Sequence, residues 1–168
     1  MSNLRSKGTF FRLYSYLPLI VLFISVLNEF DLNYLNLDYF SFNFPFILIF
    51  FFTLKEFKNL DYFFIFIAGL INDTVVGLPL GISSLSYILI CIATSYFRNI
   101  TIRPSPIKDW FYFFFVISLI NSINYSILTL FFSFNLVLLS YLVNTFFTFL
   151  FYIVFVSIFK YYLKSLND

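Results

Sequence analysis

The chain has 168 residues, of which 61% are hydrophobic and only 11% are charged, and its formal net charge is +2. A soluble domain carries roughly 25% charged residues, so we expect lipid rather than water to solvate much of this chain. The apolar runs are continuous rather than alternating, which argues against a β-barrel. Helices are then the element that can cross a membrane, and the sequence predicts an all-α, polytopic membrane bundle.

The composition also excludes several kinds of site. The sequence contains no histidine and a single cysteine, Cys91. Without histidine there is no imidazole-ligated metal site and no Ser-His-Asp triad, and one cysteine cannot form an internal disulfide. Nucleic-acid binding has no support, because no basic cluster exists outside the short loops that flank the apolar segments. We expect no cofactor and no bound metal ion.

Six apolar segments follow one another, and we interpret residues 1–168 as a single integral membrane domain. The first segment follows basic residues, as a signal peptide does, but no small-residue cleavage site ends it, so we interpret it as an uncleaved span. Pro18 and Pro45 lie near the starts of the first two segments, where a first helical turn tolerates proline. The predicted spans cover about 13–27, 40–54, 62–76, 82–97, 110–132 and 136–162.

The third and fourth segments have the least room. Between Asp61 and Arg98 there is space for two helices of about 16 residues each, near the short end of the range that crosses a bilayer. A re-entrant hairpin is the alternative interpretation. It would leave four or five complete spans.

The basic residues all fall on one side of the six-span topology. They precede the first span, lie between spans two and three and between spans four and five, and end the sixth span. The other side holds Glu29, Asp31 and Asp38. The positive-inside rule makes the basic side cytoplasmic, so both the N- and C-termini are predicted to be cytoplasmic. A re-entrant hairpin formed by the third and fourth segments would leave all the basic residues on the same side of the membrane.

Asp73 is the one charged residue that we place inside a span. A carboxylate in hydrocarbon costs about 2.5–3.5 kcal/mol on insertion scales. Such a group is a candidate proton, ion or substrate site, or an anchor for a partner helix. The structural alternative is that Asp73 lies near the outer end of a short helix and hydrogen-bonds the turn at Gly77–Gly81. In that turn, glycines supply unusual backbone angles and Pro79 stops the helix.

Small and weakly polar residues recur at three- and four-residue spacing, so each set shares one helix face. Such faces let membrane helices approach closely and hydrogen-bond, which predicts a packed six-helix bundle. The alternative is a polar cavity that binds a small ligand. The sets are Ala68, Gly69, Asn72 and Asp73; Ser83, Ser84, Tyr87, Cys91, Thr94 and Ser95; Ser118, Asn121, Ser122, Tyr125 and Thr129; and Ser140, Asn144, Thr148 and Tyr152.

The pattern gives no support for catalysis. An intramembrane hydrolase or transferase needs a catalytic pair, such as two carboxylates, a Ser-His pair or a metal set. Asp73 has no second acid and no histidine within the predicted spans. We therefore predict that the protein is not an enzyme and has no catalytic residue.

Residues 66–87 resemble the most recognisable segment of MreD, the family of bacterial rod shape-determining membrane proteins. That family shows Gly-Leu-x-x-Asp, a short gap, and then Pro-Leu-Gly followed by an apolar helix. The specific match covers only this short stretch, although the size and the topology fit along the whole chain. The segment between Lys55 and Asp61 lacks the Arg-Pro pair often seen in the family. The matching residues are Gly69, Leu70, Asp73, Pro79, Leu80 and Gly81.

The resemblance implies a non-enzymatic component of the cell-wall elongation (rod shape) complex in the bacterial cytoplasmic (inner) membrane. Members associate with MreC, a single-span protein with an extracytoplasmic domain. They work with the MreB filament, the RodA glycosyltransferase and its transpeptidase partner. The implied mechanism is helix–helix association with partners that direct peptidoglycan synthesis. The matching residues are then expected to shape the bundle or to contact partners, with membrane lipid around them.

A substrate-binding membrane subunit of a small-molecule, vitamin-type transporter is the competing prediction. Such subunits have a similar size and six helices. They usually have more charged or aromatic residues in a defined pocket, and a small-residue face that docks an energising partner. The small-residue faces of the third and fourth spans fit that second requirement.

Overall fold

The computed structural model describes residues 16–27, 41–57, 60–101, 103, 105–134 and 137–167. These residues form only helices and contain no strand, which confirms the all-α prediction. The helices are α2 (Leu17–Leu27), α3 (Phe44–Leu54), α4 (Tyr62–Val76), α5 (Ile82–Ile100), α6 (Pro106–Phe131) and α7 (Leu138–Asn167).

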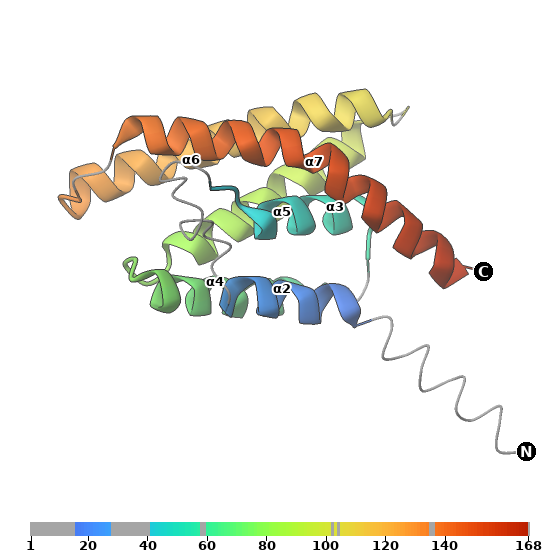
Figure 1. Ribbon diagram of the computed structural model, residues 1–168, viewed down its shortest axis with the longest axis horizontal. Helices are drawn as coiled ribbons and strands as arrows, with labels where there is room; N and C mark the ends of the chain where they lie inside the picture. The colour runs from blue at the N-terminus through green and yellow to red at the C-terminus, as the bar shows by residue number, and fades with distance from the viewer. Residues whose placement is uncertain are drawn as a thin grey trace, which may run out of the picture.

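Consecutive helices run in alternating directions, so the bundle has two chemically different ends (Figure 1). One end holds the turn between α4 and α5 and the start of α7, and we call it the turn end. The opposite end holds the C-terminal part of α7, and we call it the basic end, because the basic residues of the described segments lie there. They are Lys55, Arg98, Arg103, Lys108, Lys160 and Lys164.

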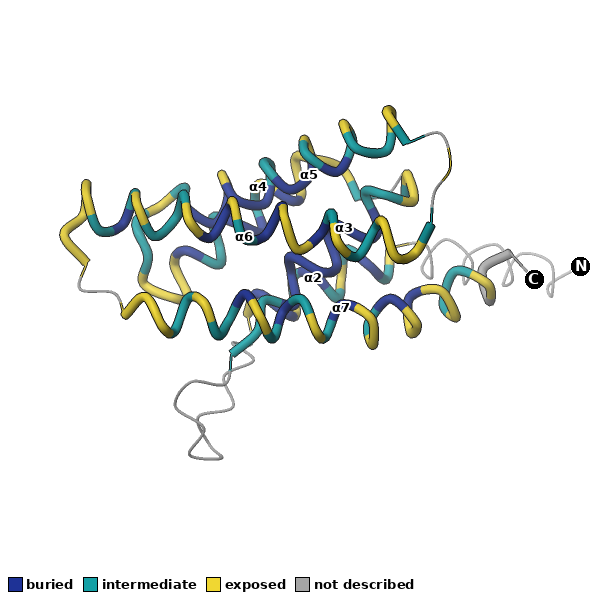
Figure 2. The backbone as a smooth tube through the Cα atoms, turned by 90° about the horizontal axis from the view of Figure 1, so that it is seen from above, coloured by how far each residue is buried: buried dark blue, intermediate teal, exposed yellow. Residues whose placement is uncertain are grey.

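Helix α3 occupies the centre of the bundle. Every residue from Phe44 to Phe52 is buried, and the helix packs against α2, α5 and α7 (Figure 2). The ring of Phe50 lies 4.9 Å from that of Phe113 and 5.8 Å from that of Tyr152. A helix that is apolar all round has no polar face to present to water, so it is either buried among other helices, as α3 is here, or surrounded by lipid.

The second span was predicted to start at about residue 40, which lies outside the described residues, but residues 41–43 are not helical and α3 begins at Phe44. Asn43 is its N-cap, and its Oδ1 accepts a hydrogen bond from the backbone N–H of Phe46 at 3.3 Å. Pro45 lies in the first turn, where its missing N–H is not needed. The N–H of Asn43 donates to Thr148 Oγ1 on α7 at 2.9 Å. A polar N-cap of this kind sets where a helix begins inside an apolar run, so the start of the helix cannot be placed from apolarity alone.

Most other predicted boundaries differ by a few residues. Helix α4 has the predicted bounds, and α2 begins at Leu17 rather than at residue 13, although residues 13–15 lie outside the described segments. Helix α6 begins four residues early because Ser105 caps it, its Oγ accepting from the N–H of Lys108 at 3.3 Å. Backbone hydrogen bonding continues into polar sequence, so α5 ends at Ile100 rather than 97 and α7 ends at Asn167 rather than 162. The predicted start of α7 at residue 136 lies outside the described residues, and the helix begins at Leu138.

Two helices, α6 and α7, are long and apolar enough to cross a membrane. Helices α2, α3 and α4 are apolar but have only 11, 11 and 15 residues. A perpendicular crossing of the hydrocarbon core, which is about 30 Å thick, needs about 20 residues at 1.5 Å each. The structure therefore supports two membrane-crossing helices, and the six crossings remain a prediction.

Candidate functional site

Asp73 is completely buried in the last turn of α4, and both of its carboxylate oxygens are paired. Oδ2 accepts a hydrogen bond from the N–H of Gly81 at 2.7 Å, and Oδ1 accepts one from the N–H of Ser83 at 2.8 Å. These donors belong to the N-terminus of α5, where N–H groups lack intrahelical partners and the helix dipole is positive. The carboxylate therefore caps α5 from the neighbouring helix. This geometry agrees with the structural interpretation of Asp73, in which its side chain hydrogen-bonds the turn that follows its helix.

The turn that Asp73 closes uses glycine at both ends. Helix α4 ends at Gly77, whose φ is +74°, and α5 is preceded by Gly81, whose φ is +106°. Positive φ values are strained for a residue with a Cβ atom. The carbonyl oxygen of Asp73 also accepts from the N–H groups of Gly77 and Leu78. One residue thus ends α4 with its main chain and starts α5 with its side chain.

Helices α4 and α5 approach each other closely at Gly69. A Cβ atom at this position would lie 2.4 Å from Ser84 Cα and 2.6 Å from Ser84 N. Two hydrogen bonds join the helices beside this contact. Ser84 Oγ donates to the carbonyl oxygen of Phe66 at 3.1 Å, and Asn72 Nδ2 donates to Ser83 Oγ at 2.8 Å. Small residues and hydroxyl groups let membrane helices pack in this way, so α4 and α5 form one tight hairpin.

The remaining matched residues are less buried within the bundle. Leu70 and Pro79 are half-buried. Leu80 is 70% exposed, at the tip of the turn between the two helices. Packing within the bundle therefore does not account for the leucine at position 80.

A cavity of about 460 Å³ lies between the helices near the turn end. Its lining combines aromatic and aliphatic side chains with asparagines, serines and one tyrosine, and none of its described lining residues carries a charge. All six described helices contribute to it. The lining asparagines are Asn43, Asn72, Asn121, Asn124 and Asn144, and the lining serines are Ser25, Ser41, Ser83, Ser86 and Ser140.

Hydroxyl groups hold three of these asparagines in place. Asn72 donates to Ser83 as described above, Asn121 Nδ2 donates to Thr145 Oγ1 at 2.7 Å, and Asn144 Nδ2 donates to Ser41 Oγ at 2.9 Å. Within the described segments, the amide oxygens of these three asparagines accept no hydrogen bond. They are not sealed in protein either, because Asp109 Oδ1 is the one described side-chain polar atom that is both buried and unpaired. These amide oxygens are therefore accessible to solvent, and the residues that carry them line the cavity.

The four predicted polar faces partly converge on this cavity. Three of the faces reach its wall through one residue each, Asn72, Ser83 and Asn121, and the fourth reaches it through Ser140 and Asn144. Other members of the same faces are buried between helices instead. A single face thus packs along part of its helix and lines the cavity along another part, so the packed bundle and the polar cavity, which were alternatives, coexist. The buried members outside the cavity wall are Ala68, Gly69, Asp73, Ser84, Tyr87, Cys91, Thr94, Thr148 and Tyr152.

Six polar lining residues belong to none of the predicted faces: Ser25, Ser41, Asn43, Ser86, Asn124 and Tyr141. Two of them, Ser86 and Asn124, bond to each other. Asn124 Nδ2 donates to Ser86 Oγ at 2.8 Å, and Ser86 Oγ lies 3.0 Å from Asn124 Oδ1 as a donor. Each residue stands one helical turn after a predicted member, Ser83 or Asn121, so the three-residue spacing was a usable signal. Asn43, which belongs to none of the predicted faces, caps α3 and lines the cavity.

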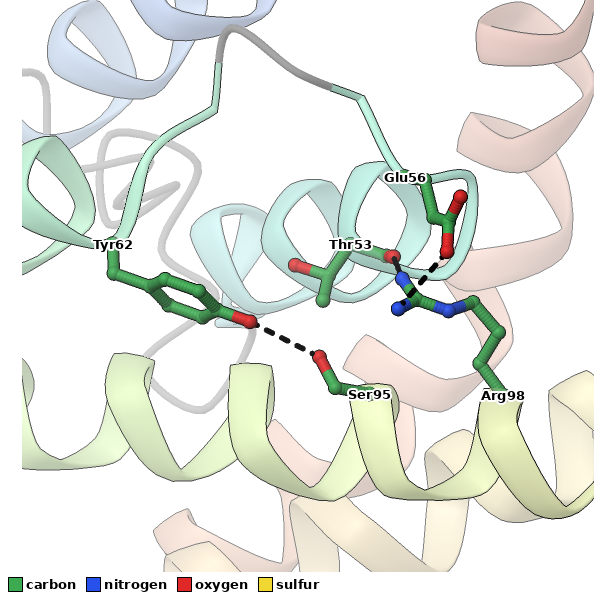
Figure 3. Close-up of polar contacts among 5 residues, drawn as sticks. All are labelled: Thr53, Glu56, Tyr62, Ser95 and Arg98. Carbon is green, nitrogen blue, oxygen red and sulfur yellow. Dashed lines mark hydrogen bonds and ion pairs between the residues drawn. The ribbon is translucent and has the colours of Figure 1, made fainter.

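At the basic end, Arg98 connects α5 to the end of α3 (Figure 3). Its Nη1 donates to the carbonyl oxygen of Thr53 at 3.0 Å, and its Nη2 lies 3.1 Å from Glu56 Oε1. The hydroxyls of Tyr62 and Ser95 are 3.2 Å apart and join α4 to α5. The last carbonyls of a helix have no intrahelical partner and lie at its negative end. Arg98 therefore satisfies the C-terminus of the central helix.

We expect Arg98→Gln to lower the free energy of unfolding by about 1–2 kcal/mol, because it removes a charge-assisted hydrogen bond and a partly exposed ion pair. Equilibrium unfolding in mixed detergent micelles measures the change. Arg103→Gln is the matched control, since Arg103 is exposed and makes no hydrogen bond or ion pair with the described residues. Equal losses in both variants would show that the effect is one of net charge.

Comparisons with protein-family models, curated proteins and solved structures found no match to this chain. The described residues also hold no group of three His, Cys, Asp or Glu side chains arranged to bind a metal ion. A function must therefore be argued from the residues of the chain and from the resemblance at 66–87.

Proposed function

We propose that this chain is a non-enzymatic, MreD-like membrane component of the bacterial cell-wall elongation complex, which acts by helix–helix association with proteins that direct peptidoglycan synthesis. The observation that supports the proposal is the α4–α5 hairpin. Gly69, Asp73 and Gly81, which the segment shares with the family, are the residues that allow the close contact and close the turn. The resemblance therefore involves positions with a physical requirement, and not only a shared apolar composition.

The proposal includes six crossings of the cytoplasmic membrane, with both chain ends in the cytoplasm. The basic residues of the described segments lie at one end of the bundle, as the positive-inside rule requires of a cytoplasmic face. Helices shorter than the hydrocarbon core are accommodated by local thinning of the bilayer. The turn end would then face outward, near the point where the extracytoplasmic part of an MreC-like partner begins.

Leu80 is the proposed contact for that partner. It is 70% exposed, and the turn that carries it is held by the hydrogen bonds of Asp73. A large apolar side chain fixed on a turn can enter a pocket of a partner with little loss of conformational entropy. In the proposed arrangement, an MreC-like single-span protein would cover Leu80, and the MreB-like filament and RodA-type synthase would join through the same assembly.

Affinity purification of the tagged protein from native membranes, in a mild detergent, tests this proposal. Mass spectrometry should identify an MreC-like protein together with wall synthases, against an unrelated membrane protein as control. Leu80→Gln should lower the recovery of the MreC-like protein several-fold. Leu130→Gln should not, although Leu130 is 78% exposed near the same end of the bundle. Absence of wall proteins from the wild-type sample would overturn the proposal.

The polar cavity favours a second candidate function, that of a substrate-binding subunit of a vitamin-type transporter. Its volume of about 460 Å³ falls within the range of small-molecule pockets, roughly 300–1,000 Å³. One expected feature is missing, because the small-residue face of α4 is covered by α5 at Gly69. Recovery of an ATPase module and a second membrane subunit, without wall proteins, would favour this candidate, as would a vitamin that co-purifies.

A further inference from the structure

We infer that the cavity at the turn end is a binding site for a neutral polyhydroxylated group, an uncharged sugar or a head group that contains one. The inference goes beyond the proposed function and does not depend on it. It rests on three properties of the cavity wall: its lack of charge, its fixed amide groups and its aromatic side chains.

The absence of charge selects against ionic ligands. None of the described lining residues is acidic or basic. Asp73, which follows the lining residue Asn72 on α4, has its carboxylate engaged, since it accepts from the N–H groups of Gly81 and Ser83. A phosphate or carboxylate in this cavity would be desolvated without a compensating cation, which is costly in an apolar surrounding. The wall therefore suits a ligand that hydrogen-bonds without carrying charge.

The amide groups of the cavity wall can pair with the hydroxyl groups of a sugar. Asn72, Asn121 and Asn144 each use one Nδ2 hydrogen on a hydroxyl of the protein. Each keeps a second N–H donor and a carbonyl acceptor for the cavity. A sugar hydroxyl both donates and accepts, so it pairs with an amide edge in either sense. Because the three side chains are already held by their partners, they lose little freedom when a ligand binds.

Aromatic side chains supply the apolar part of the site. Phe42 and Tyr141 both line the cavity. The ring of Phe42 is already engaged, since it lies 4.7 Å from that of Phe151 and stacks on that of Phe155 at 5.8 Å. The ring of Tyr141 packs edge to face against that of Tyr125 at 5.6 Å. Held in this way, the Tyr141 ring can receive the C–H face of a sugar, whose weakly positive hydrogens suit the negative face of an aromatic ring. A purely apolar ligand would cover the rings but leave the amides unpaired.

The cavity volume of about 460 Å³ lies within the range of small-molecule pockets, roughly 300–1,000 Å³, and leaves room for a monosaccharide. The hydroxyls of a monosaccharide would replace the hydrogen bonds that the polar wall otherwise makes with water. Displacement of ordered water preserves affinity when the ligand reproduces its hydrogen bonds. This requirement again favours a polyhydroxylated ligand over one with few polar groups.

Equilibrium dialysis with radiolabelled glucose and N-acetylglucosamine tests the inference, with glucuronate as the charged counterpart. The full chain should be purified in a polyoxyethylene detergent, because the head groups of maltoside and glucoside detergents are themselves neutral sugars. We expect saturable binding of at least one neutral sugar, with one site per chain, and binding of glucuronate that is weaker by about tenfold or more. Failure of both neutral sugars to bind would overturn the inference.

Ser140→Phe places an aromatic ring in the cavity and should abolish binding. Ser122→Phe adds the same ring to an exposed position of α6 outside the cavity and should leave binding intact. Should Ser140→Phe fail to fold, Ser140→Cys in a Cys91→Ser background replaces it, and the sugar should slow modification of the new thiol. Binding that survives Ser140→Phe, or glucuronate binding as tight as that of glucose, would contradict the inference.

Discussion

Gly69→Ala should lower the free energy of unfolding by about 2–4 kcal/mol, a sum of overpacking and lost hydrogen bonds. The sign is informative, because alanine is ordinarily the better helix former by about 1 kcal/mol. The new Cβ would lie 2.4 Å from Ser84 Cα and 2.6 Å from Ser84 N. Backbone atoms cannot rotate away, so α4 and α5 must separate. Their separation weakens the hydrogen bonds from Ser84 to Phe66 and from Asn72 to Ser83.

A double-mutant cycle with Ser84→Gly tests the cause. Ser84→Gly removes Oγ, which would lie 2.8 Å from the new Cβ, and leaves the Cα and N atoms in place. We therefore expect Gly69→Ala to cost nearly as much in the Ser84→Gly background as in the wild type. Unfolding in mixed detergent micelles gives both values. Full rescue by Ser84→Gly would show that only the hydroxyl is in the way, and a stabilising effect of Gly69→Ala would show that the helices are further apart.

Asp73→Asn should also be strongly destabilising, by about 2–3 kcal/mol. The amide keeps the shape of the side chain but offers one acceptor in place of two. Its Nδ2 group would face either the N–H of Gly81 or that of Ser83, which now donate to the two carboxylate oxygens. One backbone donor would then be buried without a partner, and the attraction between the carboxylate and the α5 N-terminus would be lost.

Asp61→Asn is the matched control for this variant. Asp61 precedes α4, is exposed, and makes no capping hydrogen bond with its side chain. The same change of charge there should leave stability within about 0.5 kcal/mol of the wild type. Equal stability of the wild type and Asp73→Asn would contradict the capping role and return Asp73 to the candidate proton or ion sites.

The same variant bears on the proposed function. In the wall-elongation proposal, Asp73 holds the turn that presents Leu80. An Asp73→Asn protein that still assembles with wall proteins and supports rod shape would remove this turn from the proposed interface. The measurement is the partner recovery described above, together with cell shape in a strain that carries only the variant.

Some features of the site were predictable from local sequence. The alternative in which Asp73 hydrogen-bonds the following turn required only a carboxylate placed shortly before two glycines and a proline. Turn chemistry of this kind depends on a few neighbouring residues and is therefore visible in one stretch of chain. The helix starts were less predictable, because Asn43 and Ser105 cap α3 and α6 inside or before apolar runs.

Other features depend on which helices become neighbours. Helices α3 and α7 are both apolar along most of their length, yet α3 is buried on every side and α7 has many exposed residues. Apolarity alone does not decide between the two roles, because an apolar helix is either buried among other helices or surrounded by lipid. The central position of α3 follows from its contacts with α2, α5 and α7, so only the packing of the whole bundle decided it.

Composition and helical periodicity, which are local, predict a helical chain whose surface suits lipid and whose small polar residues lie on particular helix faces. The arrangement of the helices in space is what brings these polar faces together around an uncharged cavity instead of closing them on one another. The reason is that the spacing of helices is set by contacts such as that of Gly69 with Ser84. Such contacts join residues far enough apart that no periodicity in the sequence reports them.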